Sequence, residues 1–185
     1  MAAVCRNGIS VRELLEVCWQ LAAVVEAKSD AHVVNNSSVF GLIGVPSQSA
    51  YNASKFAVRG YTESLRQELY GTSVNVMCVH PGGVRTNIVR NGRNRMNPTG
   101  NAVDPEAFAR EFEKVARTTP DRAARIIWRG ALANAPRVLV GADARLIDLV
   151  ARLFPAKYPT VFRGIERLLM RVKGAEEGTT ERSAG

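Results

Sequence analysis

Apolar residues follow two different periods along this chain. In residues 11–27 and 49–69 they recur with helical spacing, and Ser10 and Glu13 form a capping box at the start of the first helix. In residues 73–79 apolar side chains occupy both faces of an expected strand. A strand that is apolar on both faces is typical of a parallel sheet buried between helices.

The rest of the pattern continues this alternation. Further strands are expected at residues 31–36 and 137–140, further helices at 105–117, 120–134, 143–153 and 160–173, and a loop at 86–103. Strands that alternate with helices predict an α/β fold, here a three-layer Rossmann-like parallel sheet. We expect a single domain over residues 1–173 and a disordered tail over 174–185.

Composition narrows the choice of function. The chain has 185 residues and a formal net charge of +8, but its basic residues are not interleaved with aromatic ones, so nucleic acid is not an expected partner. The three cysteines lack C-x-x-C spacing and indicate reduced thiols in a cytoplasmic protein. No cluster has metal-ligand spacing, no signal peptide is recognised, and no apolar run is long enough to span a bilayer.

The stretch 146–173 has two readings. It mixes apolar residues with Arg and Lys, and basic amphipathic helices can lie on an anionic membrane surface. Helices of this kind can also pack on their own domain or on a partner subunit. Peripheral membrane contact through residues 146–173 is therefore one alternative that the sequence leaves open.

The chemistry is indicated by Tyr51 and Lys55, which share one face of the helix expected over 49–69. An isolated tyrosine has a pKa of about 10 and is a poor proton-transfer group at neutral pH. A neighbouring ammonium group favours the phenolate, so we expect Lys55 to lower the pKa of Tyr51. Such a pair can exchange a proton with an alcohol or carbonyl oxygen.

Two other segments are expected at the same edge of the sheet. Ser38 follows the strand over 31–36, and its hydroxyl could hydrogen-bond the substrate oxygen that Tyr51 protonates. The run from Pro81 to Thr86 follows the strand over 73–79. Because ligands bind beyond the carboxyl ends of parallel strands, all of these groups should converge on one site.

The runs VVNNSSVFGLIGVPSQSAYNASKFAVRGYTESLRQEL and VNVMCVHPGGVRTNI resemble the short-chain dehydrogenase/reductase family, closely over residues 31–90 and more loosely over 104–140. This resemblance implies an NAD(P)-dependent oxidoreductase that transfers hydride between the nicotinamide of NAD or NADP and a secondary alcohol or ketone. A small apolar alcohol or ketone is the implied substrate, and a homo-oligomer is the implied assembly.

The resemblance also implies roles for individual residues. Tyr51 is the implied acid/base, Lys55 the group that binds the nicotinamide ribose, and Ser38 the residue that orients the substrate; Ser37 competes with Ser38 for this role, but Ser38 has the family spacing to Tyr51. The segment after the next strand is the implied contact for the nicotinamide. Its cofactor-binding positions are Pro81, Gly82, Val84 and Thr86.

The chain also departs from the family pattern. It contains no G-x-G for the glycine-rich turn that packs against the cofactor pyrophosphate, and it lacks the Asn-Asn-Ala-Gly element of the central strand. The helix over 11–27 has no asparagine at the place where the family has a catalytic one, and Asn7 lies slightly upstream. We therefore expect the N-terminal dinucleotide-binding half to be missing. A truncated, inactive remnant and an interaction module remain alternatives to an enzyme.

Overall fold

The computed structural model describes residues 31–46, 48–88 and 104–164. The chain divides into two compact units, residues 1–147 and 148–185, which are described separately. The expected single domain over 1–173 stays a prediction. The expected helix over 11–27, most of the loop over 86–103 and the tail over 174–185 lie outside the described residues.

A parallel sheet of three strands forms the centre of the first unit. The strands are β1 (Ala31–Asn36), β2 (Val74–Pro81) and β3 (Arg137–Val140), in the order β1-β2-β3. The register pairs Val33 with Val76 on one side of β2 and Val79 with Val138 on the other. The central position of β2 explains why its sequence is apolar on both faces.

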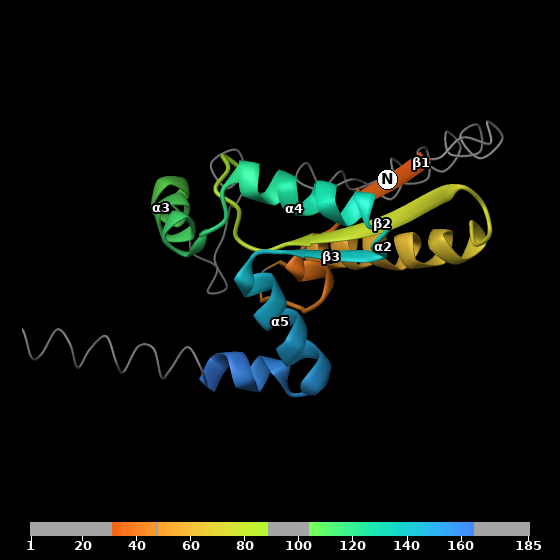
Figure 1. Cartoon of the computed structure of the whole chain (residues 1–185). Helices are drawn as coiled ribbons and strands as arrows, with labels where there is room; N and C mark the ends of the chain where they lie inside the picture. Colours follow the sequence, from red (N-terminus) through yellow and green to blue (C-terminus); the bar gives the residue numbers. More distant parts are fainter. Residues whose placement is uncertain (1–30, 47, 89–103, 165–185) are drawn as a thin grey trace, which may run out of the picture. The chain divides into compact units, whose positions relative to one another are not determined.

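Two helices cover the opposite faces of this sheet (Figure 1). The helix α2 (Ser49–Glu68) packs on one face, where Leu65 meets Val74 and Val76. The helix α4 (Pro120–Leu132) packs on the other, in a cluster with the β2 and β3 residues Met77, Val79, Val138 and Val140. Helix, sheet and helix make three layers, so the predicted α/β architecture is confirmed.

The strand β2 is longer than the sequence predicted. It was expected to end at Val79, with a turn beginning at His80, but it continues through Pro81 because β3 supplies partners there. The amides of Cys78 and Gly82 donate to the carbonyls of Pro136 and Val140 on the β3 side. Successive residues of a strand direct their backbone groups to alternate sides, so the Pro81 nitrogen faces β1, which has already ended. Proline has no N–H to donate, and at this position the sheet requires none.

The other expected elements differ only at their ends. The helix α3 (Pro105–Val115) follows the N-cap Asp104, and Thr119 caps α4 as predicted. The helix α5 (Ala142–Leu153) crosses the boundary between the units, and residues 158–164 are helical. Within the described ranges, every helix is too short or too polar to cross a membrane.

A short 3-10 helix, η1 (Val39–Gly41), lies unusually close to α2. The Ser37 hydroxyl donates to the Lys55 carbonyl over 2.8 Å, across this contact. A Cβ at Gly41 would lie 2.4 Å from the Ser37 Oγ and 2.7 Å from the Lys55 carbonyl oxygen. These distances leave room for glycine and for no larger residue.

We predict that Gly41→Ala destabilises the chain by about 1–3 kcal/mol, because the added methyl group forces η1 away from α2. Gly60→Ala is the control. Gly60 lies in α2, on the other side of this contact, and nothing lies within 4 Å of its Cβ position. Its replacement by alanine should therefore be neutral or stabilise the chain by up to about 1 kcal/mol. Urea unfolding of both variants checks this, and equal stability of the two would contradict the close contact.

Candidate active site

Two neighbouring serines at the end of β1 have separate surroundings. Ser37 is buried, and its hydroxyl donates a hydrogen bond to the Lys55 carbonyl. Ser38 is half-buried, its Oγ accepts from the Phe40 amide over 3.1 Å, and its hydroxyl lowers the pKa of the Tyr51 side chain. The structure therefore brings Ser38, and not Ser37, to Tyr51.

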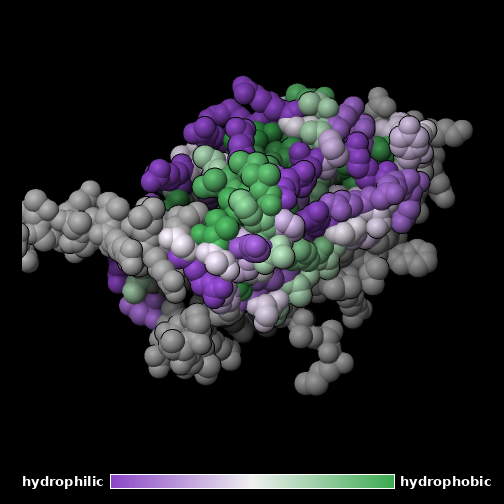
Figure 2. Space-filling model, turned by 90° about the horizontal axis from the view of Figure 1, so that it is seen from below, coloured by the Kyte–Doolittle hydropathy of each residue, from purple (hydrophilic) through white to green (hydrophobic). Residues whose placement is uncertain are grey.

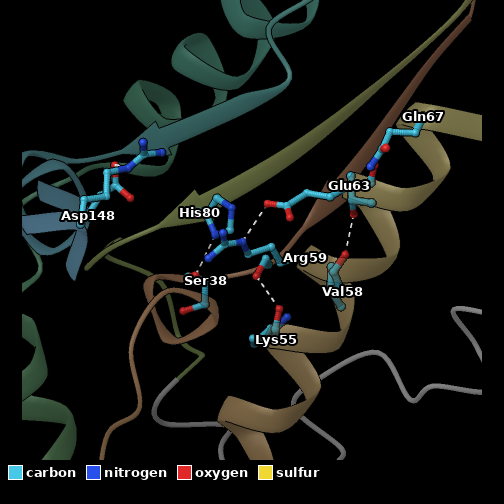
Figure 3. A network of polar contacts seen from close by, with 11 residues as sticks. Ser38, Lys55, Val58, Arg59, Glu63, Gln67, His80 and Asp148 are labelled. Carbon is cyan, nitrogen blue, oxygen red and sulfur yellow. Dashed lines mark hydrogen bonds and ion pairs between the residues drawn. The ribbon is translucent and has the colours of Figure 1, made fainter. Parts of the chain in front are cut away.

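Tyr51 and Lys55 project from the first turns of α2, as the spacing predicts. The Lys55 side chain is buried, with 6% of the residue exposed, and its Nζ donates to the Asn36 carbonyl over 3.1 Å. The same Nζ lies 5.5 Å from the centroid of the Tyr51 ring. Figure 3 shows Lys55, on α2, on the side of the network where Ser38 and His80 lie. Ser38, Tyr51 and Lys55 thus share one edge of the sheet.

Asn52, which no sequence pattern marks, holds the segment after η1 against α2. Its Nδ2 donates to the carbonyls of Phe40 and Ile43 over 2.8 and 2.7 Å, and its Oδ1 accepts from the Val45 amide over 3.1 Å. The Phe40 ring then meets the edge of the Tyr51 ring, with their centroids 5.8 Å apart. Asn52 therefore keeps Phe40 packed beside Tyr51.

Burial dominates the electrostatics of the pair. It raises the pKa of the Tyr51 hydroxyl above its ordinary value of 10.0, and the hydrogen bond with Ser38 opposes that shift. Burial also lowers the pKa of the Lys55 ammonium below 10.5, while the neighbouring Cys78 thiol raises it. The pKa of Tyr51 is thus raised overall and not lowered as we expected, because desolvation by burial outweighs the hydrogen bond with Ser38.

The turn after β2 is held from two sides. The Gly82 amide donates to the Val140 carbonyl over 2.9 Å, and the Gly83 amide donates to the Asp143 carboxylate. A Cβ at Gly82 would displace this carboxylate, so glycine at this position leaves room for Asp143 to reach the Gly83 amide. Asp143, on α5, was also missed by the sequence analysis, because nothing near it in the sequence marks its distant partner.

The cofactor-binding positions expected in this turn are accessible. Pro81, Gly82 and Val84 are half-buried and Thr86 is exposed, at the end of β2. Val84 forms an isolated parallel bridge with Thr118, which fixes the path of the chain beyond the glycines. His80 Nδ1 lies 3.0 Å from the Ser38 carbonyl oxygen, so this turn and Ser38 belong to the same edge of the sheet.

The part of the chain that the structure describes contains no cluster of side chains that could hold a metal ion. No group of three or more His, Cys, Asp or Glu side chains comes together there. Cys78 is buried in the middle of β2, and burial raises the pKa of its thiol to about 11. This thiol is protonated at neutral pH, which makes it a poor nucleophile.

Comparisons with known proteins identify the family of this chain. A family model described as short chain dehydrogenase matches residues 8–97. SadH of Mycobacterium tuberculosis, a protein named as an oxidoreductase, is 45% identical over 137 residues, which are 72% of this chain and 48% of SadH. The chain thus spans about half the length of the curated relatives it matches first.

Solved structures agree with the fold. A short-chain dehydrogenase from Streptomyces avermitilis superposes with a TM-score of 0.57 at 28% identity, covering 80% of this chain and 54% of that protein. A short-chain dehydrogenase/reductase from Burkholderia phymatum in complex with NAD gives a TM-score of 0.57 at 24% identity, covering 70% of this chain and 50% of that protein. The second likeness concerns the fold alone.

We predict that the difference in stability between the wild-type chain and Lys55→Met depends on pH. The unfolded chain binds the Lys55 proton more tightly than the folded chain, because burial lowers the folded pKa. The contribution of Lys55 is therefore least favourable below that lowered pKa and improves as pH rises from there towards 10.5.

Urea unfolding of both chains over this pH range makes the measurement. The stability lost as Tyr51 ionises in the unfolded chain, above 10.0, is common to both chains and largely cancels in the comparison. The wild type should gain stability relative to Lys55→Met as pH rises. A difference that stays constant would mean that the Lys55 ammonium is not desolvated.

Proposed function

Because this chain belongs to the short-chain dehydrogenase/reductase family, we propose that it carries the proton-transfer centre of an NAD(P)-dependent oxidoreductase acting on a secondary alcohol or ketone. The observation that carries the proposal is the arrangement of Ser38, Tyr51 and Lys55, in which a buried ammonium lies 5.5 Å from the ring of a tyrosine that is hydrogen-bonded to a serine. A small apolar substrate suits the apolar ring of Phe40 beside Tyr51.

In carbonyl reduction, the Tyr51 hydroxyl donates its proton to the substrate oxygen, and in alcohol oxidation it takes that proton back. The Ser38 hydroxyl holds the same oxygen in place and stabilises charge that develops on it. The raised pKa of Tyr51 keeps the hydroxyl protonated in the free chain, which prepares it as a donor. Lys55, anchored on the Asn36 carbonyl, fixes positive charge behind the ring.

The residues at this edge fit the nicotinamide end of a dinucleotide. A nicotinamide cofactor, when bound, would supply or accept the hydride. Lys55 and Tyr51 offer donors to ribose hydroxyls, and Pro81, Gly82, Val84 and Thr86 would line the nicotinamide side. Solved relatives are described in complex with NAD and with NADP, which supports a nicotinamide cofactor and leaves the choice between the two open.

The second candidate is a family member without catalytic activity. It is favoured by the absence of G-x-G from the sequence, because the pyrophosphate of a dinucleotide needs close approach to backbone amides at a helix N-terminus. The Ser38, Tyr51 and Lys55 arrangement favours the first candidate, since nothing in the packing of the fold requires a tyrosine hydroxyl beside a serine hydroxyl. Binding and turnover distinguish the two.

Self-association and membrane contact are two further proposals, and both rest on exposed apolar side chains. On α2, Phe56 is 41% exposed, and this apolar side chain gives a second copy of the chain a surface to cover. Light scattering tests this self-association, and a monomer at high concentration would contradict it. Figure 2 shows apolar side chains at the surface, in several areas among hydrophilic ones. In the second unit Leu149 and Leu153 are exposed, which suits either contact through residues 146–173, and pelleting with anionic vesicles would test the membrane alternative.

We predict that, under conditions in which the chain takes up a reduced cofactor, Tyr51→Phe abolishes ketone reduction, with a loss of at least about 100-fold, because it removes the proton donor and leaves the ring in place. Lys55→Ala should weaken both cofactor binding and turnover. Tyr70→Phe is the control, since Tyr70 is 91% exposed and lies just beyond the C-terminal end of α2. Turnover is measured at saturating reduced cofactor with a series of simple ketones. Tyr51→Phe activity equal to that of Tyr70→Phe would sink the assignment.

We also predict that this chain binds NAD(H) and NADP(H) weakly or not at all. Its described residues address the nicotinamide end, and the sequence offers no glycine-rich turn for the pyrophosphate. Isothermal titration should therefore give similar weak signals for each dinucleotide and for nicotinamide mononucleotide, which lacks the adenosine half. Micromolar binding of a dinucleotide at one equivalent per chain would contradict this and would favour an intact enzyme.

A further inference from the structure

His80 occupies a costly position that the proposed chemistry does not use. It lies at the end of β2 and is fully buried, with none of its surface exposed. A buried imidazole is unfavourable unless its polar atoms are hydrogen-bonded, whereas an aliphatic side chain would fill the same space without that requirement. The contacts of the ring therefore indicate what the histidine contributes.

One ring nitrogen of His80 faces the backbone of Ser38. His80 Nδ1 lies 3.0 Å from the Ser38 carbonyl oxygen. A dashed line marks this contact in Figure 3. A carbonyl oxygen can only accept, so the hydrogen must be on Nδ1. The same carbonyl also accepts from the Gly41 amide over 3.0 Å. The Ser38 peptide is thus held both by η1 and by the adjacent strand.

We propose that His80 is a positioning residue of the active site, whose Nδ1–H holds the Ser38 carbonyl and thereby keeps the Ser38 hydroxyl against Tyr51. This inference rests on the proposed function of Ser38 and Tyr51. Ser38 has an extended backbone, with φ −167° and ψ 168°, and its Oγ is already aligned by the Phe40 amide. Rotation of the Ser38 peptide would move this Oγ away from the tyrosine.

The test measures the ionisation of Tyr51 in the chain without cofactor. Tyrosine labelled at Cζ gives one NMR signal per ring, and Tyr51→Phe identifies the signal of Tyr51. Because the Ser38 hydrogen bond lowers the pKa of Tyr51, losing it should raise that pKa further. His80→Leu should raise it as far as Ser38→Ala does, and should have no further effect when combined with Ser38→Ala.

Two amide variants separate positioning from simple filling of space. The side-chain N–H of asparagine can lie where Nδ1–H lies, so His80→Asn should keep the wild-type pKa of Tyr51. Glutamine extends its N–H to the position of Nε2, so His80→Gln should behave as His80→Leu. If His80→Leu does not fold, the difference in Tyr51 pKa between His80→Asn and His80→Gln tests the proposal instead. Lys55, whose Nζ lies 5.5 Å from the centroid of the Tyr51 ring, is unchanged in every variant.

The proposal is overturned if His80→Leu or His80→Gln leaves the pKa of Tyr51 unchanged, or if either shifts it equally in the Ser38→Ala chain. Failure of the proposed function gives a different result: Tyr51→Phe then retains turnover, while the His80 variants still move the Tyr51 signal through Ser38. The two ideas can therefore fail separately.

Discussion

The close contact between η1 and α2 is the constraint on which the site depends. Glycine at position 41 lets the backbone of η1 approach the Lys55 carbonyl, and the Ser37 hydroxyl bridges the remaining gap. Asn52 closes the other side of this contact by binding three backbone groups of the segment from Phe40 to Val45. Ser38 lies between these two attachments, so its position beside Tyr51 follows from packing.

The same contact sets the chemistry by removing water. Tyr51 and Lys55 are both shifted towards their neutral forms because burial is the largest influence on each pKa. The Ser38 hydroxyl offsets only part of that effect for Tyr51, and Cys78 offsets only part of it for Lys55. In the free chain the tyrosine is therefore held as a proton donor, and additional positive charge would be needed to make the phenolate accessible near neutral pH.

The sequence predicted those features that depend on local pattern. The two apolar faces of residues 74–79 predicted a buried parallel strand, and the spacing of Tyr51 and Lys55 predicted a shared helix face. The extension of β2 to Pro81 was not predictable locally, because β3 supplies its partners from far along the chain. The contacts of His80 likewise depend on the register between β1 and β2, which no single segment encodes.

The most direct test of this account is the pKa of Tyr51 in Ser38→Ala and in the double variant Ser38→Ala/Asn52→Ala, measured without cofactor, because both chains lack the Ser38 interaction that lowers this pKa. Loss of Asn52 should release the segment that carries Phe40 and let water reach the Tyr51 ring. The account predicts a pKa above 10.0 in Ser38→Ala and a value closer to 10.0 in the double variant, with the sheet intact in both. The same pKa in both chains would show that the contact between η1 and α2 does not control the tyrosine.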